Sequence, residues 1–369
     1  MEKILHVTTS HKIDDIRIFM KECSTLAENG YAITLMGFGA ISSTYQERNV
    51  KVVSIKLIEN KRMFRLIINP IYVFTRIMRS DFRIVHFHDP EFMLYAYILK
   101  VLFHKKVIYD IHEDVPKQIM QKDWINRSLR QFVSASYKNI EDFLSKRFDC
   151  LIAATESIKR RFEKENKNTV GVYNYPDLSL LPDISNNYKT RDSVCYIGLI
   201  SRERGISELI KAIQICGVNL ILCGEFESSL FRKEVESLAG WANVTYLGRL
   251  PYREAMNKVN RCFAGIVTFL PFPNHLESMP NKLFEYMAMG VPVIASNFET
   301  WKNIVEKEKT GICVNPRDPD DIARAISFLR CNSEFMETCA FHGRLLVINN
   351  YSWNSQYQQL HNAYKKLLA

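Results

Sequence analysis

Short apolar runs alternate with amphipathic stretches along both halves of the chain. A run of four to eight apolar residues is typical of a buried strand, and apolar positions repeating every three to four residues are typical of a helix. The predicted strands of the first half are 4–8, 32–36, 50–55, 83–87, 106–111, 149–154 and 170–173. Helices are predicted at 19–28, 67–78 and 92–103. Strands that alternate with helices indicate βαβ units and a parallel sheet.

The same alternation restarts after a segment rich in Pro, Asn and Ser that begins at Tyr175. The predicted strands of the second half are 193–197, 219–223, 244–246, 265–268, 293–295 and 311–314. Helices are predicted at 208–215, 228–237, 253–258 and 318–329, followed by a terminal helix at 357–368. The second half is therefore predicted to form a parallel sheet of its own.

Length supports this division, because 369 residues exceed the roughly 250–300 at which a single hydrophobic core stops growing. The predicted domains are 1–176, a linker at 177–190, and 191–350, with 351–369 as the terminal helical segment. The fold class is α/β, with two doubly wound Rossmann-like domains. Ligands of such sheets bind at the carboxyl ends of the strands, so we expect the two sets of loops to face each other across a cleft.

The net charge and the composition indicate which classes of partner and which cellular compartment to expect. The formal net charge of +9 and the pI of about 9.0 favour an anionic partner. No nucleic-acid-binding signature accompanies the charge, so we expect no nucleic acid. Nine cysteines without a Cys-x-x-Cys pair indicate a reducing, cytoplasmic compartment. We recognise no signal peptide, and no apolar run has the ~18–20 residues of a membrane-spanning helix.

The segment from Glu277 to Gly290 carries the most specific chemistry. Two glutamates, Glu277 and Glu285, flank a loop containing Lys282, and an apolar helix follows. A helix N-terminus with a lysine beside it suits a phosphate, and a carboxylate one turn later can accept hydrogen bonds from sugar hydroxyls. Phosphate beside ribose indicates a nucleotide. The alternative is an ordinary surface loop and amphipathic helix with solvated glutamates.

A second candidate phosphate site follows the first strand of the second half. Gly198 permits a tight turn, and Arg202 and Arg204 then place forked donors near the start of a helix. The alternative is a solvated turn with local ion pairs.

Together these motifs resemble the donor site of retaining glycosyltransferases of family 4, which have the glycosyltransferase-B fold. The resemblance implies that Glu285 binds ribose, that Glu277 lies beside the donor sugar, and that the terminal helix crosses back to the first domain. The implied donor-binding residues are Gly198, Arg202, Arg204, Gly224, Arg249, Leu250, Glu277, Met279, Pro280, Asn281, Lys282, Leu283 and Glu285. Two positions depart from the family pattern: Met279-Pro280 replaces a common aromatic-Gly pair, and Leu199 replaces a basic residue.

Three loops of the first half extend the resemblance to a bacterial subgroup of the family. They carry Asp15-Ile-Arg17, His88-Asp-Pro and Asp110-Ile-His112-Glu113. The resemblance places His112 beside the donor sugar. The acceptor-side candidates are Asp15, Arg17, His88 and Glu113. Alternatively, Asp15 and Arg17 form a salt bridge that shapes the loop, and a strand-end histidine is structural.

The histidines and carboxylates of these loops also suggest a metal site. His86, His88, Asp110, His112 and Glu113 are all potential ligands. Glycosyltransferase-B enzymes, however, generally stabilise the leaving diphosphate with Arg, Lys and a helix dipole. The resemblance therefore implies no catalytic metal and no cofactor beyond the nucleotide-sugar donor.

The predicted function is retaining transfer of a hexose-type sugar from a nucleotide sugar to an acceptor hydroxyl. The predicted catalytic residues are His112, Glu277, Arg202, Arg204 and Lys282. The resemblance implies an acceptor that is a lipid-linked or growing surface polysaccharide, such as capsule or lipopolysaccharide. Basic residues around an apolar helix suit peripheral contact with an anionic membrane. The alternative is a buried helix with a solvated basic rim. These basic residues are Lys56, Lys61, Arg62, Arg65, Arg76, Arg79, Arg83, Lys100, Lys105, Lys106, Lys117, Lys122, Arg127 and Arg130.

Two other functions remain open: a catalytically inactive nucleotide-binding partner subunit, and a nucleotide-sugar epimerase or hydrolase on the same scaffold. A dehydrogenase is disfavoured because the first strand is followed by Thr9-Ser10-His11 and not by Gly-x-Gly-x-x-Gly.

Overall fold

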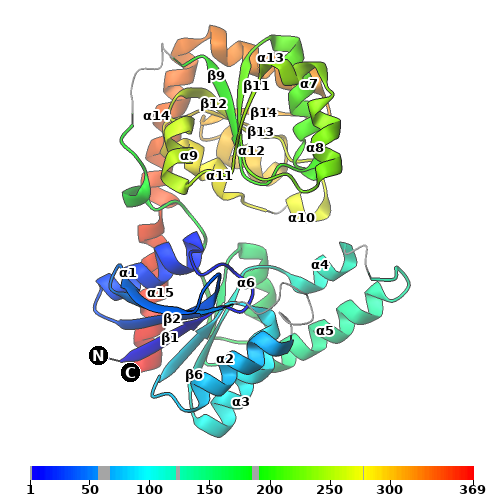
Figure 1. Ribbon diagram of the computed structural model, residues 1–369. Helices are drawn as coiled ribbons and strands as arrows, with labels where there is room; N and C mark the ends of the chain where they lie inside the picture. Colours follow the sequence, from blue (N-terminus) through cyan, green and yellow to red (C-terminus); the bar gives the residue numbers. More distant parts are fainter. Residues whose placement is uncertain (1, 57–66, 122–124, 185–190, 277) are drawn as a thin grey trace. The chain divides into compact units, whose positions relative to one another are not determined.

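The computed structural model describes residues 2–56, 67–121, 125–184, 191–276 and 278–369. These residues form two compact units, Met1–Asn174 with Asn354–Ala369 and Tyr175–Trp353 (Figure 1). Residues 185–190 of the predicted linker lie outside the described residues. Each unit contains one sheet of mainly parallel strands.

The first unit is built on an eight-stranded sheet with the order β3-β4-β2-β1-β5-β6-β7-β8. Only the edge strand β3 is antiparallel to its neighbour within the described sheet. The order reverses between β1 and β5, the position where doubly wound sheets bind ligands. The strands are β1 (Lys3–Val7), β2 (Ala32–Gly39), β3 (Ser43–Glu47), β4 (Val50–Lys56), β5 (Ile84–Phe87), β6 (Lys106–Ile111), β7 (Cys150–Ala153) and β8 (Thr169–Gly171).

The two faces of this sheet differ in chemistry. Leu5, Val7, Val85 and Phe87 pack on one face with apolar residues of the helices that cover it. Because side chains alternate along a strand, His6 and His86 point to the other face. The helical elements are η1 (Ile16–Cys23, a π-helical segment), α1 (Ser24–Glu28), α2 (Asn69–Met78), η3 (Pro90–Phe92), α3 (Met93–Phe103), α4 (Val115–Gln121), α5 (Arg130–Ser145), α6 (Glu156–Phe162) and α15 (Trp353–Leu368).

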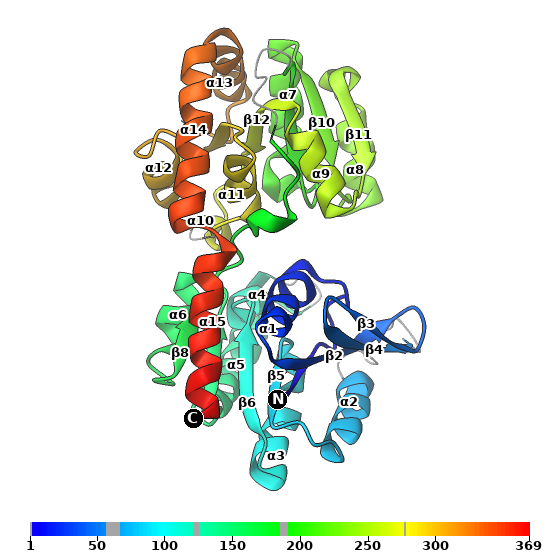
Figure 2. The ribbon, with the colours of Figure 1, turned by 90° about the vertical axis from the view of Figure 1, so that its left-hand side faces the viewer.

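The terminal helix α15 belongs to the first unit although it follows the second unit in the chain (Figure 2). The hydroxyl of Tyr364 lies 2.7 Å from Nδ1 of His86. Nζ of Lys106 donates to the carbonyl oxygen of Leu367 at 2.8 Å. Polar contacts thus attach α15 to strands β5 and β6.

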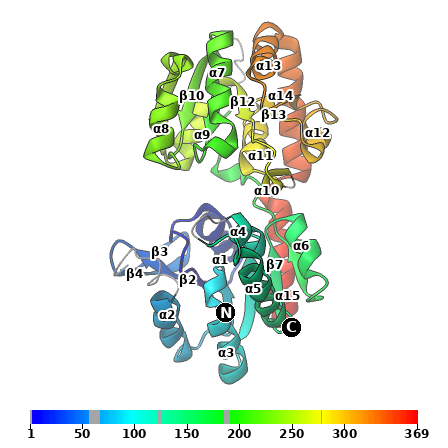
Figure 3. The same cartoon turned by 90° about the vertical axis from the view of Figure 1, so that its right-hand side faces the viewer.

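The second unit has a six-stranded, parallel sheet with the order β11-β10-β9-β12-β13-β14 (Figure 3). Its order reverses between β9 and β12. The strands are β9 (Ser193–Ile197), β10 (Asn219–Cys223), β11 (Val244–Gly248), β12 (Cys262–Val267), β13 (Val293–Ser296) and β14 (Gly311–Val314).

Helices cover both faces of this second sheet, because its strands contribute to two separate apolar clusters. One cluster contains side chains of α7, α8 and α13, and the other contains side chains of α9, α11 and α12. The helical elements are η4 (Leu178–Leu180), η6 (Arg202–Arg204), α7 (Ile206–Cys216), α8 (Ser229–Glu236), η7 (Ala239–Asn243), α9 (Tyr252–Val259), α10 (Pro273–Leu276), α11 (Asn281–Ala288), α12 (Glu299–Val305), α13 (Pro319–Cys331) and α14 (Ser333–Asn350).

The predicted fold class is confirmed, with parallel α/β sheets in two units. The bounds of several elements were wrong. The helix predicted at 19–28 begins at Ile16, because Asp15 caps it, and the strand predicted at 265–268 begins at Cys262. Strand β3 and helices α4, α5, α6, α10, α12 and α14 were not predicted. No described helix has both the length and the apolarity that crossing a membrane would require.

We predict that Leu360→Ala lowers the free energy of unfolding by about 3 kcal/mol, since Leu360 is fully buried on α15 and its truncation leaves a cavity. Urea denaturation followed by circular dichroism measures the change. Lys365→Ala, at an exposed position of the same helix, is the control and should change it by less than about 0.5 kcal/mol. Equal effects of the two substitutions would contradict the docking of α15.

Candidate functional site

The loops that follow β9 and β10 in the second unit approach each other closely. Gly198 and Gly224 stand at the ends of these strands with φ of +120° and +147°. A Cβ on Gly224 would lie 1.8 Å from the carbonyl oxygen of Gly198, so only glycine fits there. The amide of Gly198 donates to Cys223 O at 2.9 Å. At Gly198 and Gly224 no side chain covers the backbone, and Gly198 lies at the end of β9, where the strand order reverses. This segment is called the bare backbone below.

The side chain of Lys282 lies against this bare backbone. Its Nζ is 3.0 Å from the position of a Cβ on Gly198 and 3.6 Å from the ring centroid of Tyr196. Lys282 is only 6% exposed, and its Nζ has no hydrogen-bond partner among the described residues. Burial, followed by the charge of Arg204, lowers the pKa of Lys282 well below its usual value. A buried amine without an acceptor is suited to receive an anion.

Arg204 completes a pair of cations at the same place. Its Nη1 is 3.4 Å from the same Cβ position on Gly198, and its guanidinium carbon lies 5.2 Å from the ring centroid of Phe269. The sequence-predicted residues Gly198, Arg204 and Lys282 thus come together. We call these three residues the cation cluster.

Arg202 is not part of the cation cluster. It is exposed, and its guanidinium forms a two-pronged ion pair with the carboxylate of Glu234, with Nη1 to Oε1 at 2.8 Å. A backbone bond to Glu227 at 3.0 Å also holds the residue. The guanidinium of Arg202 therefore pairs in a bidentate manner with Glu234, whereas the sequence predicted that it would pair with a diphosphate.

The N-terminus of α11 begins with the predicted Met279-Pro280-Asn281 segment. Pro280 occupies the N-cap without a side-chain hydrogen bond, and its carbonyl oxygen accepts from the amide of Leu283 at 3.0 Å. Lys282 is the second residue of the helix, so its charge adds to the positive end of the helix dipole. Glu277 lies outside the described residues.

Glu285 lies one turn further along α11 and is partly exposed. It faces the hydroxyl of Tyr252, whose pKa is raised well above its usual value by burial and by the charge of Glu285. Its charge also opposes the fall in the pKa of Lys282. Glu285 therefore lies near the cation cluster and is a partly exposed residue.

The remaining donor-side candidates lie at the ends of neighbouring strands. Arg249 is exposed and lies 3.6 Å from Glu225, and Leu250 is half-buried. Both follow β11, beside the loop of Gly224. They stand at the same sheet edge as the cation cluster.

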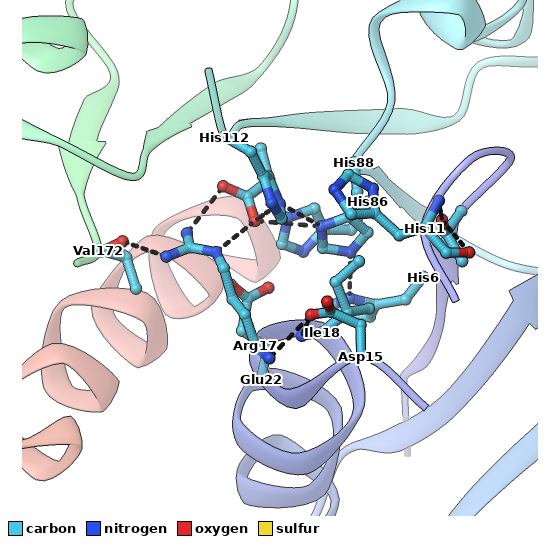
Figure 4. A network of polar contacts seen from close by, with 12 residues as sticks. His6, His11, Asp15, Arg17, Ile18, Glu22, His86, His88, His112 and Val172 are labelled. Atoms are coloured by element: carbon cyan, nitrogen blue, oxygen red, sulfur yellow. Dashed lines mark hydrogen bonds and ion pairs between the residues drawn. The ribbon is translucent and has the colours of Figure 1, made fainter. Parts of the chain in front are cut away.

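In the first unit, Asp110 is the centre of a buried polar network. Figure 4 shows three members of this network, Arg17, His88 and His112. Arg17 donates from Nη2 to Oδ1 at 2.9 Å, and Nε2 of His112 and Nδ1 of His88 lie 2.9 and 3.1 Å from Oδ2. Burial acts to raise the pKa of Asp110, but the charges of Arg17 and His112 outweigh it and hold the pKa well below its usual range. Asp110 is therefore an ionised carboxylate that orients both imidazoles.

Arg17 is buried as well and has three acceptors. Beyond Asp110, its Nη1 donates to Val172 O at 2.8 Å, and its Nε lies 3.0 Å from Oε1 of Glu22. Asp15 instead accepts backbone bonds from Arg17 at 2.8 Å and Ile18 at 3.0 Å. Among the described contacts the guanidinium thus pairs with Asp110 and Glu22, so the predicted Asp15–Arg17 salt bridge is replaced by a helix cap.

The other candidates of the first unit, His88, His112 and Glu113, differ in their exposure to solvent. His88 is 1% exposed, so it supports Asp110 from inside and is remote from solvent. His112 is partly exposed. Glu113 is exposed and accepts a hydrogen bond from Gln118. Only His112 joins the buried network to the surface among these three.

Three residues of this network were missed from the sequence: His6, Glu22 and Tyr364. His6 lies 3.0 Å from His88 and 3.0 Å from the hydroxyl of Tyr364. The available signal was a polar residue at a position where the pattern of an apolar strand or helix requires burial. His6 within Ile4–Val7 and Glu22 next to Cys23 both fit that description.

Comparisons with known proteins identify the family. The model of the family described as glycosyltransferase family 4 matches residues 19–175, and that of glycosyl transferases group 1 matches residues 180–344. The capsular polysaccharide biosynthesis glycosyltransferase CapM of Staphylococcus aureus is 25% identical over 308 residues, covering 73% of this chain and 79% of the relative. The O-antigen chain mannosyltransferase B of Escherichia coli is 28% identical over 47% of this chain and 45% of its own length.

Solved structures share the fold of the whole chain. Sucrose-phosphate synthase of Thermosynechococcus elongatus superposes with a TM-score of 0.79 at 17% identity, covering 100% of this chain and 99% of the other. Anabaena HepE, in complex with UDP and glucose, has a TM-score of 0.75 at 15% identity, with 99% and 100% covered. The chain belongs to the glycosyltransferases of the family 4 type, with the glycosyltransferase-B fold.

We predict that Lys282→Met stabilises the ligand-free protein. Methionine keeps much of the volume and removes a buried amine that has no hydrogen-bond acceptor among the described residues, which should add about 1 kcal/mol after loss of the contact with Tyr196. Thermal and urea unfolding measure the effect. Lys211→Met, at an exposed position on α7, is the matched control and should be neutral. A marked loss of stability in Lys282→Met would contradict an unsatisfied amine.

Proposed function

We propose that the protein transfers a hexose-type sugar from a nucleoside-diphosphate sugar to an acceptor hydroxyl, with retention of configuration at the anomeric carbon. The observation that carries the proposal is the buried amine of Lys282, which lies beside Arg204 and the bare backbone of Gly198 without an acceptor among the described residues. A diphosphate would supply that acceptor.

The donor would lie along the carboxyl edge of the second sheet. Lys282, Arg204 and the first amides of α11 would hold the diphosphate, and Glu285 would accept hydrogen bonds from the ribose hydroxyls. HepE, which shares the fold, has been solved with UDP and with UDP-glucose. Glu277 would orient the donor sugar, as the family resemblance implies.

The chemistry would rely on electrostatic stabilisation. The bond between the anomeric carbon and the diphosphate oxygen breaks, and the acceptor oxygen forms a bond to the same face of that carbon. The departing diphosphate oxygen takes the proton of the acceptor hydroxyl. Lys282 and Arg204 stabilise the negative charge that develops on this oxygen, which is commonly the largest catalytic contribution. His112, fixed by Asp110, would orient the sugar.

The acceptor would be a lipid-linked or growing surface polysaccharide. The relative CapM is named for capsular polysaccharide biosynthesis and the relative from Escherichia coli for the O-antigen chain. Helix α5 begins at Arg130, one of the basic residues predicted to contact a membrane, and exposes Phe132, Ile140 and Phe143. Lys61, Arg62, Arg65 and Lys122 of that basic set lie outside the described residues. Peripheral attachment to anionic lipid would bring the enzyme to such an acceptor.

We predict that Glu285→Ala weakens donor binding by about 10- to 150-fold, because a charge-assisted pair of hydrogen bonds contributes roughly 1.5–3 kcal/mol. A thermal-shift panel of UDP, GDP, CDP and ADP first identifies the base, and isothermal titration then compares the two proteins. Glu299→Ala, at an exposed position on α12, is the matched control and should bind as the wild type does.

Equal nucleotide affinity in Glu285→Ala and Glu299→Ala would remove Glu285 from the ribose role. Nucleotide binding without turnover on any lipid-linked or glycan acceptor would favour the inactive partner subunit. Conversion of the donor without an acceptor would favour the epimerase or hydrolase.

A further inference from the structure

Four buried side chains of the first unit converge on one point behind the surface. They are His6 on β1, Glu22 on η1, His86 on β5 and His88 in the loop after β5 (Figure 4). Each is at most 1% exposed, and one ligand atom from each lies within 4.8 Å of those of the other three. We call these residues the histidine quartet. None of them belongs to the proposed donor site in the second unit.

Every histidine of the quartet is held from outside through one ring nitrogen. Nδ1 of His88 lies 3.1 Å from the carboxylate of Asp110. Nδ1 of His86 and Nε2 of His6 lie 2.7 and 3.0 Å from the hydroxyl of Tyr364. Metal-bound histidines are typically fixed this way, with the outer nitrogen on a carboxylate or another oxygen and the inner nitrogen on the metal.

Not every inner atom of the quartet has, within the described residues, the hydrogen bond that a buried polar group requires. Nε2 of His86 has no hydrogen-bond partner among the described residues. One oxygen of Glu22 pairs with Nε of Arg17 at 3.0 Å, and the other has no hydrogen-bond partner among them. Nδ1 of His6 and Nε2 of His88 are 3.0 Å apart. Two nitrogens at that separation can both lie about 2.1 Å from one metal ion. A buried polar atom without a partner destabilises the fold, and one ion at this point would give Nε2 of His86 and the second oxygen of Glu22 a common partner.

We propose that the histidine quartet binds one zinc ion. Three imidazoles and one carboxylate are a ligand set that suits zinc, and four protein ligands leave no coordination position for substrate, which is characteristic of a structural site. The positive charge of the ion is offset by Glu22 and by Asp110, which also pairs with Arg17. The ion would join β1 and η1 to β5, which lies much further along the chain.

The experiment measures zinc in the full-length chain after removal of any affinity tag, because a histidine tag binds metal itself. Mass spectrometry of the purified protein should find about one zinc per chain. His86→Gln should lower this to less than about one tenth, and His342→Ala, in the second unit, should retain it. Substitution with Co²⁺ should give the visible absorption of a tetrahedral site.

A second measurement uses the wild-type protein, so that a folding defect in His86→Gln does not decide the outcome. A chelator should lower the melting temperature by several degrees, and equimolar Zn²⁺ should restore it. The proposal would be overturned if the protein contained no zinc and its melting temperature changed with neither chelator nor Zn²⁺. An ion that His86→Gln retains would also overturn it.

Discussion

The first unit depends on the burial of Arg17. A guanidinium stays protonated at any physiological pH, and an unpaired buried charge costs several kcal/mol, so carboxylates must accompany it. Asp110 on β6 and Glu22 on η1 meet this requirement, and the carbonyl oxygen of Val172 accepts a hydrogen bond from Nη1 of Arg17. Because Asp110 must remain ionised beside Arg17, its second oxygen is available to fix His88 and His112. One buried cation thus determines where a helix, two strand ends and two imidazoles lie.

The second unit has the opposite arrangement. Its buried amine, on Lys282, has neighbouring aromatic rings but no hydrogen-bond acceptor among the described residues. Natural proteins retain a buried polar group without a hydrogen bond chiefly at functional sites, where a ligand can supply the missing partner. In the first unit the charges satisfy one another and build a rigid support, whereas in the second a charge is left for a partner from outside the chain. The same chemistry therefore serves structure in one unit and binding in the other.

The alternation of apolar runs was sufficient to predict the parallel strands, and β6, β9, β10 and β14 begin and end at the predicted residues. Strand β3 was missed because all five of its residues, Ser43–Glu47, are polar or aromatic and mostly exposed, so no apolar run marks it. Helix α14 was missed because its apolar residues are spread around the helix and not confined to one stripe. Within the site, the sequence motifs predicted that Gly198, Arg204 and Lys282 bind one ligand, and the structure places these three residues together. The pairs Arg17–Asp110 and His86–Tyr364, separated by 93 and 278 residues, depend on tertiary packing that no local pattern encodes.

The crossing of α15 back to the first unit makes the second unit an insertion in chain order. During synthesis, residues 1–174 leave the ribosome long before Tyr364, whose hydroxyl contacts His6 and His86 in the interior of that unit. Domains made first usually fold first. Here the interior of the amino-terminal unit stays incomplete until residue 364 has been synthesised, whereas the inserted unit has all of its own strands by then. The unit that is made first is thus the last to be finished, and a premature stop near the end of the message damages the beginning of the protein.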